Sequence, residues 1–332
     1  MPEKPVQSED KKSPSSKDKE YILSLSYGKD SLACLGAIEK LGWPLDRIVH
    51  AEIWATDTIQ ADLPPMVEFK EKADRIIKER YGIEVEHYCA MKDDQKLTYE
   101  RMFYTIPTRR KPERERERER ERELWRQQGT ILGFPMRRMP WCNSRLKRNA
   151  LRFPSYNRVM VQETQVRDVS TDSRCAWGIG VHPSKHLFSN KRLARGAKIN
   201  TVQYLGIAAD EPERVERHTK DGFMLPLVEA GWDEAYCRKW CEENDLLSPI
   251  YTTATRGGCW FCHNQSVDQL RLLRKNYPDL WQLLLKWDND SPVTFKSDGH
   301  TVHDFDRRFS MEDTGKAPND RTFRWKLLDN VR

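Results

Sequence analysis

Short apolar runs alternate with amphipathic stretches in the first part of the chain. Residues 21–26 (YILSLS) and 47–57 (RIVHAEIWATD) are apolar nearly throughout, as in strands that are covered on both faces. Residues 30–41 and 63–82 have the spacing of helices, and each ends at a glycine. A third strand is predicted over residues 84–89. Strands that alternate with helices across short links predict an α/β fold with a parallel sheet.

The same pattern continues later in the chain. Residues 202–210 (VQYLGIAAD) predict another strand, and residues 233–244 predict a helix with Asp233 as its N-cap. Residues 266–288 predict two helices that are interrupted before Pro278. We therefore expect a helical C-terminal extension over 266–332.

Three segments do not fit a compact domain. The polar residues 1–18 predict a disordered tail. Residues 109–128 contain the repeat ERERERERERE, which has no apolar face and is predicted to be a solvated low-complexity insert, with a partner-binding helix as the alternative. Residues 153–200 are irregular and predict a loop insertion. One α/β domain would then comprise residues 19–108 and 129–265.

Composition adds few constraints. The chain has 332 residues and a formal net charge of +6, from 57 basic and 51 acidic side chains, an excess too mild to indicate nucleic-acid binding by itself. It has no apolar stretch of membrane-spanning length and no signal-peptide core near its start. We therefore expect a cytoplasmic protein with no membrane association. Its eight cysteines are not expected to form disulfides, and Cys34 and Cys89 are predicted to be core residues.

A polar turn, SYGKDS at residues 26–31, separates the first predicted strand from the first predicted helix. Unpaired N–H groups at a helix start and the helix dipole attract anions. Gly28 permits a close backbone approach, and Lys29 adds a cation. The turn is therefore a candidate phosphate site, and a helix cap without a ligand is the alternative.

This turn resembles the Ser-x-Gly-x-Asp-Ser pyrophosphate loop of the adenine nucleotide α-hydrolase (PP-loop) superfamily, and its bulky Tyr27 resembles the phosphoadenosine phosphosulfate (PAPS) reductase branch. Five later segments resemble that family in the same order. They are WATDTIQADLPPMVEF, WCNSRLKRNAL, YLGIAADEPER, PLVEAGWDEAYCRKWCEENDLLSPIY and RGGCWFC. The chain departs from the family pattern where Ile59 replaces a glycine, Ala208 an arginine and Asn143 a cysteine.

The resemblance implies a Rossmann-like parallel sheet with helices on both faces, and an adenine nucleotide as ligand. Sulfonucleotide reductases of this family use a cysteine in a C-terminal motif, whereas no cysteine follows Cys262 here. We therefore expect an enzyme that uses ATP to activate an acceptor with release of pyrophosphate. Sulfur transfer would follow, as in the DNA-phosphorothioation and tRNA-thiolation relatives. The alternatives are a PAPS or APS reductase and a non-catalytic nucleotide-binding module.

The resemblance also implies site residues. Lys29 and the loop amides would hold the pyrophosphate, and Asp30 or Asp57 would help to hold Mg²⁺ with ATP. Lys147 matches a lysine of the reductases, so the predicted catalytic residues are Lys29, Asp30 and Lys147. The predicted nucleotide-binding residues are Ser26, Tyr27, Gly28, Lys29, Asp30, Ser31, Asp57, Thr58 and Arg145.

Arg145 and Lys147 belong to a basic stretch over residues 136–152. It is interpreted as a solvated face, as a clamp on the nucleotide, or as a contact with nucleic acid. The expected partners beyond the nucleotide are therefore a nucleic-acid acceptor or a sulfur donor protein.

Four cysteines are predicted to form one metal centre. Cys259 and Cys262 have the two-residue spacing at which one turn presents two thiolates to one ion. Cys142 lies in the segment that resembles the cluster-binding segment of iron–sulfur APS reductases. Cys241 is the expected fourth ligand, with Cys237 or His263 as alternatives. The resemblance favours a 4Fe–4S cluster, zinc is the second choice, and reduced structural thiols are the third.

Overall fold

The computed structural model describes only part of the chain. The described residues are 19–93, 95–107, 130–135, 140–151, 181–183, 200–252, 257–320 and 322–328. The predicted tail over 1–18, the charged insert over 109–128 and most of the predicted insertion over 153–200 lie outside them. Within the described residues, no helix has the length and apolar character needed to cross a membrane.

The centre of the fold is a mostly parallel sheet. Strands β1 (Lys19–Ser24), β2 (Arg47–Ala51), β3 (Val85–Lys92) and β6 (Asn200–Tyr204) are parallel in the order β3-β2-β1-β6. The short strands β4 (Gln95–Lys96) and β5 (Val181–Pro183) both pair antiparallel with β3. The segment expected to be an irregular insertion therefore contributes one strand, β5, to the sheet.

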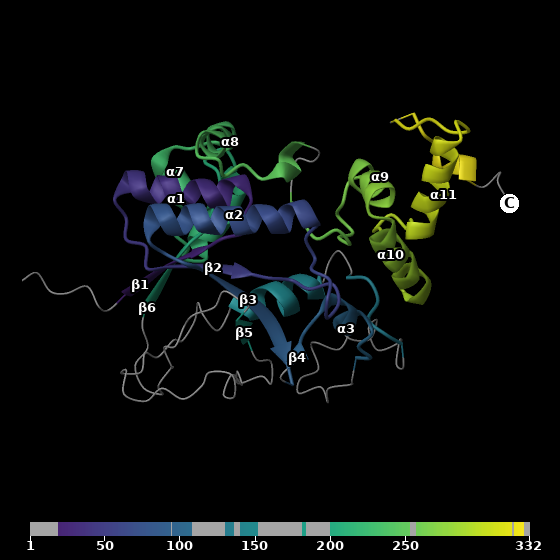
Figure 1. Ribbon diagram of the computed structural model, residues 1–332, viewed down its shortest axis with the longest axis horizontal. Helices are drawn as coiled ribbons and strands as arrows, with labels where there is room; N and C mark the ends of the chain where they lie inside the picture. The colour runs from purple at the N-terminus through teal and green to yellow at the C-terminus, as the bar shows by residue number, and fades with distance from the viewer. Residues whose placement is uncertain are drawn as a thin grey trace, which may run out of the picture.

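Alternate side chains of the strands enter two separate cores. Leu23 of β1 and Ile48 of β2 face four helices, α1 (Lys29–Leu41), α2 (Pro64–Tyr81), α7 (Pro226–Ala230) and α8 (Glu234–Glu243). Figure 1 shows these helices together above the sheet. Ile22 and Val49 belong to the opposite core. Burial on both faces explains why the strands are apolar nearly throughout.

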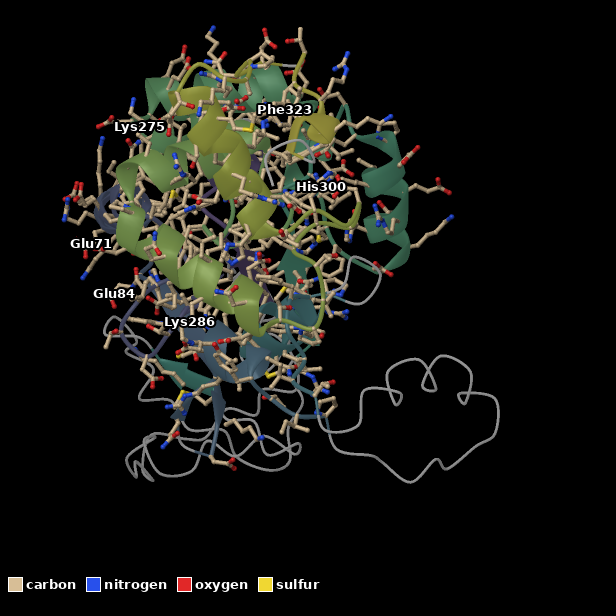
Figure 2. The ribbon with its side chains drawn as sticks, turned by 90° about the vertical axis from the view of Figure 1, so that its right-hand side faces the viewer. Glu71, Glu84, Lys275, Lys286, His300 and Phe323 are labelled. Carbon is tan, nitrogen blue, oxygen red and sulfur yellow. The ribbon has the colours of Figure 1, made fainter. Side chains whose placement is uncertain are left out.

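The opposite core is rich in aromatic side chains. It joins α3 (Tyr99–Phe103) and a π-helix (Asn143–Arg148) to the C-terminal helices α9 (Val267–Asn276), α10 (Pro278–Asp290) and α11 (Val302–Asp313). The helices α9–α11 form a group at one end of the sheet (Figure 1), and Figure 2 views the molecule from their side, with Lys286 on α10 and His300 just before α11. These three helices thus pack against the sheet through the aromatic core.

The remaining elements are short or lie at the surface. They are α6 (Pro212–Lys220) and the 3-10 helices η4 (Pro249–Thr252) and η5 (Trp325–Leu328).

Two strands are shorter than predicted. After Ala51 the chain turns back on itself, and Ala55 N donates to Ile59 O at 2.8 Å. Ile53 and Ala55 are buried although they lie beyond the end of β2. The apolar run there therefore indicates burial and not strand pairing. β6 ends at Tyr204, two residues before a close approach between Gly206 and the start of α1.

The predicted N-cap of α8 is confirmed, because the Asp233 side chain accepts a hydrogen bond from Tyr236 N at 2.7 Å. We expect Asp233→Ala to lower the free energy of unfolding by about 1 kcal/mol, since the first turn of α8 would lose this acceptor. Asp233→Asn keeps an acceptor and should cost much less. Urea titrations of the three proteins measure the difference, and equal losses for both variants would contradict the capping role.

Candidate functional site

The hexapeptide turn lies at the carboxyl end of β1, where the strand order of the sheet reverses. The chain leaves β1 through α1 to reach β2 on one side and returns much later to β6 on the other side. In open α/β sheets, ligands bind outside the carboxyl ends of the strands at such a reversal. The turn also leads directly into α1, whose first-turn N–H groups have no acceptor within the helix.

Hydrogen bonds within the turn fix its shape. Ser26 N donates to Ser31 Oγ at 3.1 Å, and the two serine hydroxyls are 3.0 Å apart. Ser31 Oγ also lies 3.0 Å from Gly28 O. A Cβ on Gly206 would lie 2.7 Å from Ser31 Cα and 2.8 Å from Ser31 N, so the chain after β6 presses directly on the turn. The turn is therefore a preformed structure and not a loose connection.

Lys29 is a charged, mostly buried group at this turn. Its Nζ lies 2.7 Å from Asp30 and 3.3 Å from Glu234, and its side chain is 11% exposed. Burial disfavours the charged ammonium, but the hydrogen bond and charge of Asp30 outweigh this effect and raise the pKa of Lys29. Lys29 N donates to the Tyr251 hydroxyl at 3.0 Å. A permanent cation and a tyrosine hydroxyl therefore lie beside the candidate phosphate site.

An acidic group lies next to Lys29. Carboxylate oxygens of Asp30, Glu211 and Glu234 lie within 4.8 Å of one another. Burial raises the pKa of Asp30, and the neighbouring Lys29 opposes that shift. Carboxylates at this spacing can share a hard cation such as Mg²⁺, which needs only one or two of them when phosphate supplies further oxygens.

Three other predicted nucleotide ligands are exposed. Asp57 and Thr58 lie in the turn after β2, and Asp57 forms an ion pair with Arg101 of α3 at 2.9 Å. Arg145 lies exposed on the π-helix. The contacts of the described residues do not bring these three side chains to the turn at residues 26–31.

A second site lies on the aromatic side of the sheet. Cys142, Cys259 and Cys262 line one cavity of about 100 Å³, together with Lys147 and Tyr99. Trp260 places the Cys259–Cys262 turn, since its backbone N donates to Ala61 O at 2.9 Å and its Nε1 to Gln60 O at 3.0 Å. The structure therefore brings together three of the four predicted metal ligands and Lys147, one of the two lysines predicted to be catalytic.

Two thiols of this cavity, those of Cys142 and Cys259, have raised pKa values. Burial raises the pKa of Cys259 to about 12, and Lys147 acts in the opposite direction. Burial, followed by the neighbouring Cys262, also raises the pKa of Cys142. A metal would have to displace the thiol protons, so its binding should weaken as the pH falls.

A buried hydroxyl without a partner points into this site. The Tyr99 hydroxyl is fully buried, and it has no hydrogen-bond partner among the described residues. Trp141 Nε1 is also buried without a partner among the described residues, and the Trp141 ring lies 4.9 Å from the Tyr99 ring between centroids. Buried donors are rarely left unpaired in folded proteins. The residues present therefore fit a bound group that offers acceptor atoms, such as the sulfurs of an iron–sulfur cluster.

Cys241 does not join these thiols, contrary to the prediction. It lies on α8 in the core between α1 and the sheet, with Cys34 and Cys237, whereas Cys142 and Cys259 pack on the opposite core. Its thiol donates to Lys29 O at 3.3 Å. Burial raises the pKa of Cys241 to about 12, as expected for a structural thiol. The predicted core positions of Cys34 and Cys89 are confirmed.

Sequence reasoning did not select Glu211, Glu234, Tyr251 or Tyr99. Glu211, Glu234 and Tyr251 lie in segments that resemble the family, and this position could have marked them as candidates. Tyr99 lies outside all of these segments, so nothing in the sequence indicated it. No protein-family model, curated protein or solved structure matches the chain, so the family assignment remains a prediction from its motifs.

Proposed function

We propose that this chain is a PP-loop enzyme of the PAPS reductase type that binds ATP and activates an acceptor with release of pyrophosphate. The observation that carries the proposal is the preformed turn at residues 26–31, with its buried cation Lys29, at the point where the strand order reverses. A Rossmann-like fold of the PP-loop type is part of the same proposal. Fixed backbone amides and a fixed charge stabilise phosphate without reorganisation during the reaction.

The proposed reaction is an adenylyl transfer. A nucleophilic oxygen of the acceptor attacks the α-phosphorus of ATP, the bond between that phosphorus and the bridging oxygen breaks, and pyrophosphate leaves with the electron pair. Lys29 and the first-turn amides of α1 would hold the pyrophosphate. Asp30, with Glu211 and Glu234, would hold the Mg²⁺ that accompanies ATP. Hydrosulfide would then attack the activated atom of the acceptor, a bond from sulfur to that atom would form, and AMP would leave with the oxygen that it had activated.

An iron–sulfur cluster is the proposed occupant of the cysteine cavity, with zinc as the alternative. Cys142, Cys259 and Cys262 line the cavity together, and the buried Tyr99 hydroxyl, which has no partner among the described residues, could donate to a sulfide of the cluster. Cys142, Cys259 and Cys262 would hold the cluster, which supplies sulfur binding or electron transfer when bound.

Removing the Lys29 charge tests the nucleotide site. We expect Lys29→Ala to weaken ATP binding by about tenfold or more, since a charge-assisted contact contributes roughly 1.5–3 kcal/mol. Lys78→Ala is the matched control, because Lys78 is 63% exposed and pairs with Glu84 at the end of α2. Calorimetric titration with ATP and Mg²⁺ measures both affinities. Equal affinity of the Lys29 variant and wild type would remove the basis of the proposal.

The reaction itself is tested with α-³²P-labelled ATP, Mg²⁺, a hydrosulfide source and either bulk tRNA or DNA. Formation of AMP and pyrophosphate only when one nucleic acid is present would support the proposal and identify the acceptor class. In a parallel assay with PAPS and a dithiol reductant, formation of sulfite would support the reductase alternative. ATP binding with neither reaction would indicate a non-catalytic nucleotide-binding module.

A further inference from the structure

Tyr27 has an unusual backbone conformation inside the phosphate turn. Its φ is 56°, in the left-handed region that glycine adopts readily and that costs free energy for other residues. Its side chain is completely buried. A bulky residue persists in this conformation only where its surroundings fix it. The contacts of the Tyr27 side chain therefore bear directly on the shape of the turn.

The phenol of Tyr27 is held at both of its hydrogen-bonding positions. Its hydroxyl donates to Asp74 of α2, and it lies 3.0 Å from Nε2 of His87 on β3. His87 Nε2 is also 2.8 Å from the second carboxylate oxygen of Asp74. Burial, followed by the negative charge of Asp74, raises the pKa of Tyr27 well above its usual value, so the phenol keeps its proton. Tyr27, Asp74 and His87 thus form a closed triad beneath the turn.

A second chain of contacts holds the residue before the turn. His50 Nδ1 is 2.8 Å from Leu25 O, and His50 Nε2 is 2.9 Å from Lys70 Nζ. Burial, followed by the charge of Lys70, lowers the pKa of His50 well below its usual value, so the ring is neutral. The ammonium of Lys70 donates to Nε2, so Nδ1 carries the proton and donates to Leu25 O. Lys70 Nζ also lies over the Tyr27 ring, 5.3 Å from its centroid.

We propose that Tyr27 is the positioning residue of the phosphate turn, and that its bonds to Asp74 and His87 hold the amides that follow it in the orientation that binds phosphate. This inference rests on the proposed nucleotide-binding function. Glycine would adopt the same φ without cost but without an anchor. Tyrosine at this position bears the conformational cost of the positive φ, but its side chain is hydrogen-bonded to α2 and β3.

Packing alone does not account for this arrangement. A phenylalanine ring would fill the same volume, and it would leave Asp74 and His87 without their shared hydroxyl. The Tyr27 ring and the His50 imidazole pack edge to face, with 4.8 Å between their centroids. His50 is itself hydrogen-bonded to Leu25 O and Lys70, so a polar group also forms part of the packing around Tyr27. The hydroxyl is therefore the part of Tyr27 whose removal separates positioning from packing.

The test compares Tyr27→Phe with Tyr204→Phe. Tyr204 is also completely buried, and its hydroxyl makes one hydrogen bond, to Pro44 O at 2.9 Å, away from the turn. Both variants lose a buried hydroxyl, and Tyr27→Phe should lose more thermal stability than Tyr204→Phe, because the Tyr27 hydroxyl contacts both Asp74 and His87. We expect only Tyr27→Phe to weaken ATP and inorganic pyrophosphate binding, by about tenfold, as for the loss of one buried hydrogen bond. Adenosine affinity should be unchanged in both.

A second measurement does not depend on any ligand. Amide hydrogen exchange at residues 28–32 should become faster in Tyr27→Phe than in wild type or Tyr204→Phe, because the turn has lost its anchor. Asp74→Asn keeps an acceptor for the Tyr27 hydroxyl and should exchange more slowly than Asp74→Ala.

The outcomes distinguish the inference from the proposed function. If wild type binds ATP and Tyr27→Phe binds it equally well, with unchanged exchange at residues 28–32, Tyr27 is a packing residue and the inference is overturned. If wild type binds neither ATP nor pyrophosphate, the proposed function fails and the phosphate-positioning role fails with it. If amide exchange at residues 28–32 is nevertheless faster in Tyr27→Phe, Tyr27 fixes the shape of the turn, but the turn does not bind these phosphates.

Discussion

Replacing Gly206 with alanine is expected to reduce ATP affinity by roughly tenfold to a hundredfold, since overpacking of a tight contact costs about 1–3 kcal/mol. A Cβ at this position would lie 2.7 Å from Ser31 Cα and 2.9 Å from Asp30 C. These are backbone atoms, so no side chain can rotate away to relieve the contact. The start of α1 would have to move, and with it the amides and the Lys29 charge that form the candidate phosphate site.

Gly222→Asn is the matched control for this variant. Gly222 follows α6 with φ 83°, nothing lies within 4 Å of the position of its Cβ, and asparagine tolerates left-handed backbone better than most residues. Calorimetric titration with ATP and circular dichroism spectra should show a folded Gly206→Ala protein with weak binding and a control that binds normally. Wild-type affinity in Gly206→Ala would mean that the turn does not contact the nucleotide.

Cys259→Ser is expected to abolish metal binding in protein purified without oxygen. Cys259 is one of three thiols around a single cavity, and a serine hydroxyl is a poor ligand for iron or zinc at neutral pH. Wild type should be brown and carry iron and acid-labile sulfide, and the variant should be colourless. Elemental analysis and the visible absorption spectrum measure both properties.

Cys241→Ala is the control that separates the predicted ligand set from the observed one. Its thiol contacts Lys29 O in the other core, so this variant should retain the full iron content of wild type. Loss of iron in Cys241→Ala would restore Cys241 as a ligand. Wild-type protein with neither iron nor zinc would leave the cavity as a set of structural thiols.

The sequence by itself determined the local elements. The limits of α1 at Gly42, of α2 at Gly82 and of α9 before Pro278 follow from glycine and proline, whose backbone preferences act within a few residues. The strand-turn-helix context of residues 26–31 was equally local. Strand ends were predicted less well, because residues such as Ile53 are buried after the sheet has ended and an apolar run cannot distinguish these two situations.

Only the tertiary structure decided which side chains meet. Cys241 is buried and Cys259 is half-buried, both lie near aromatic residues in the sequence, and no local pattern says that they pack on opposite faces of the sheet. The anchoring of Tyr27 by Asp74 and His87, and the grouping of Asp30 with Glu211 and Glu234, join residues from separate elements. The hydrophobic pattern records that an element is buried, whereas the partner of each side chain depends on strand order and helix placement. Those are set by the packing of the whole chain.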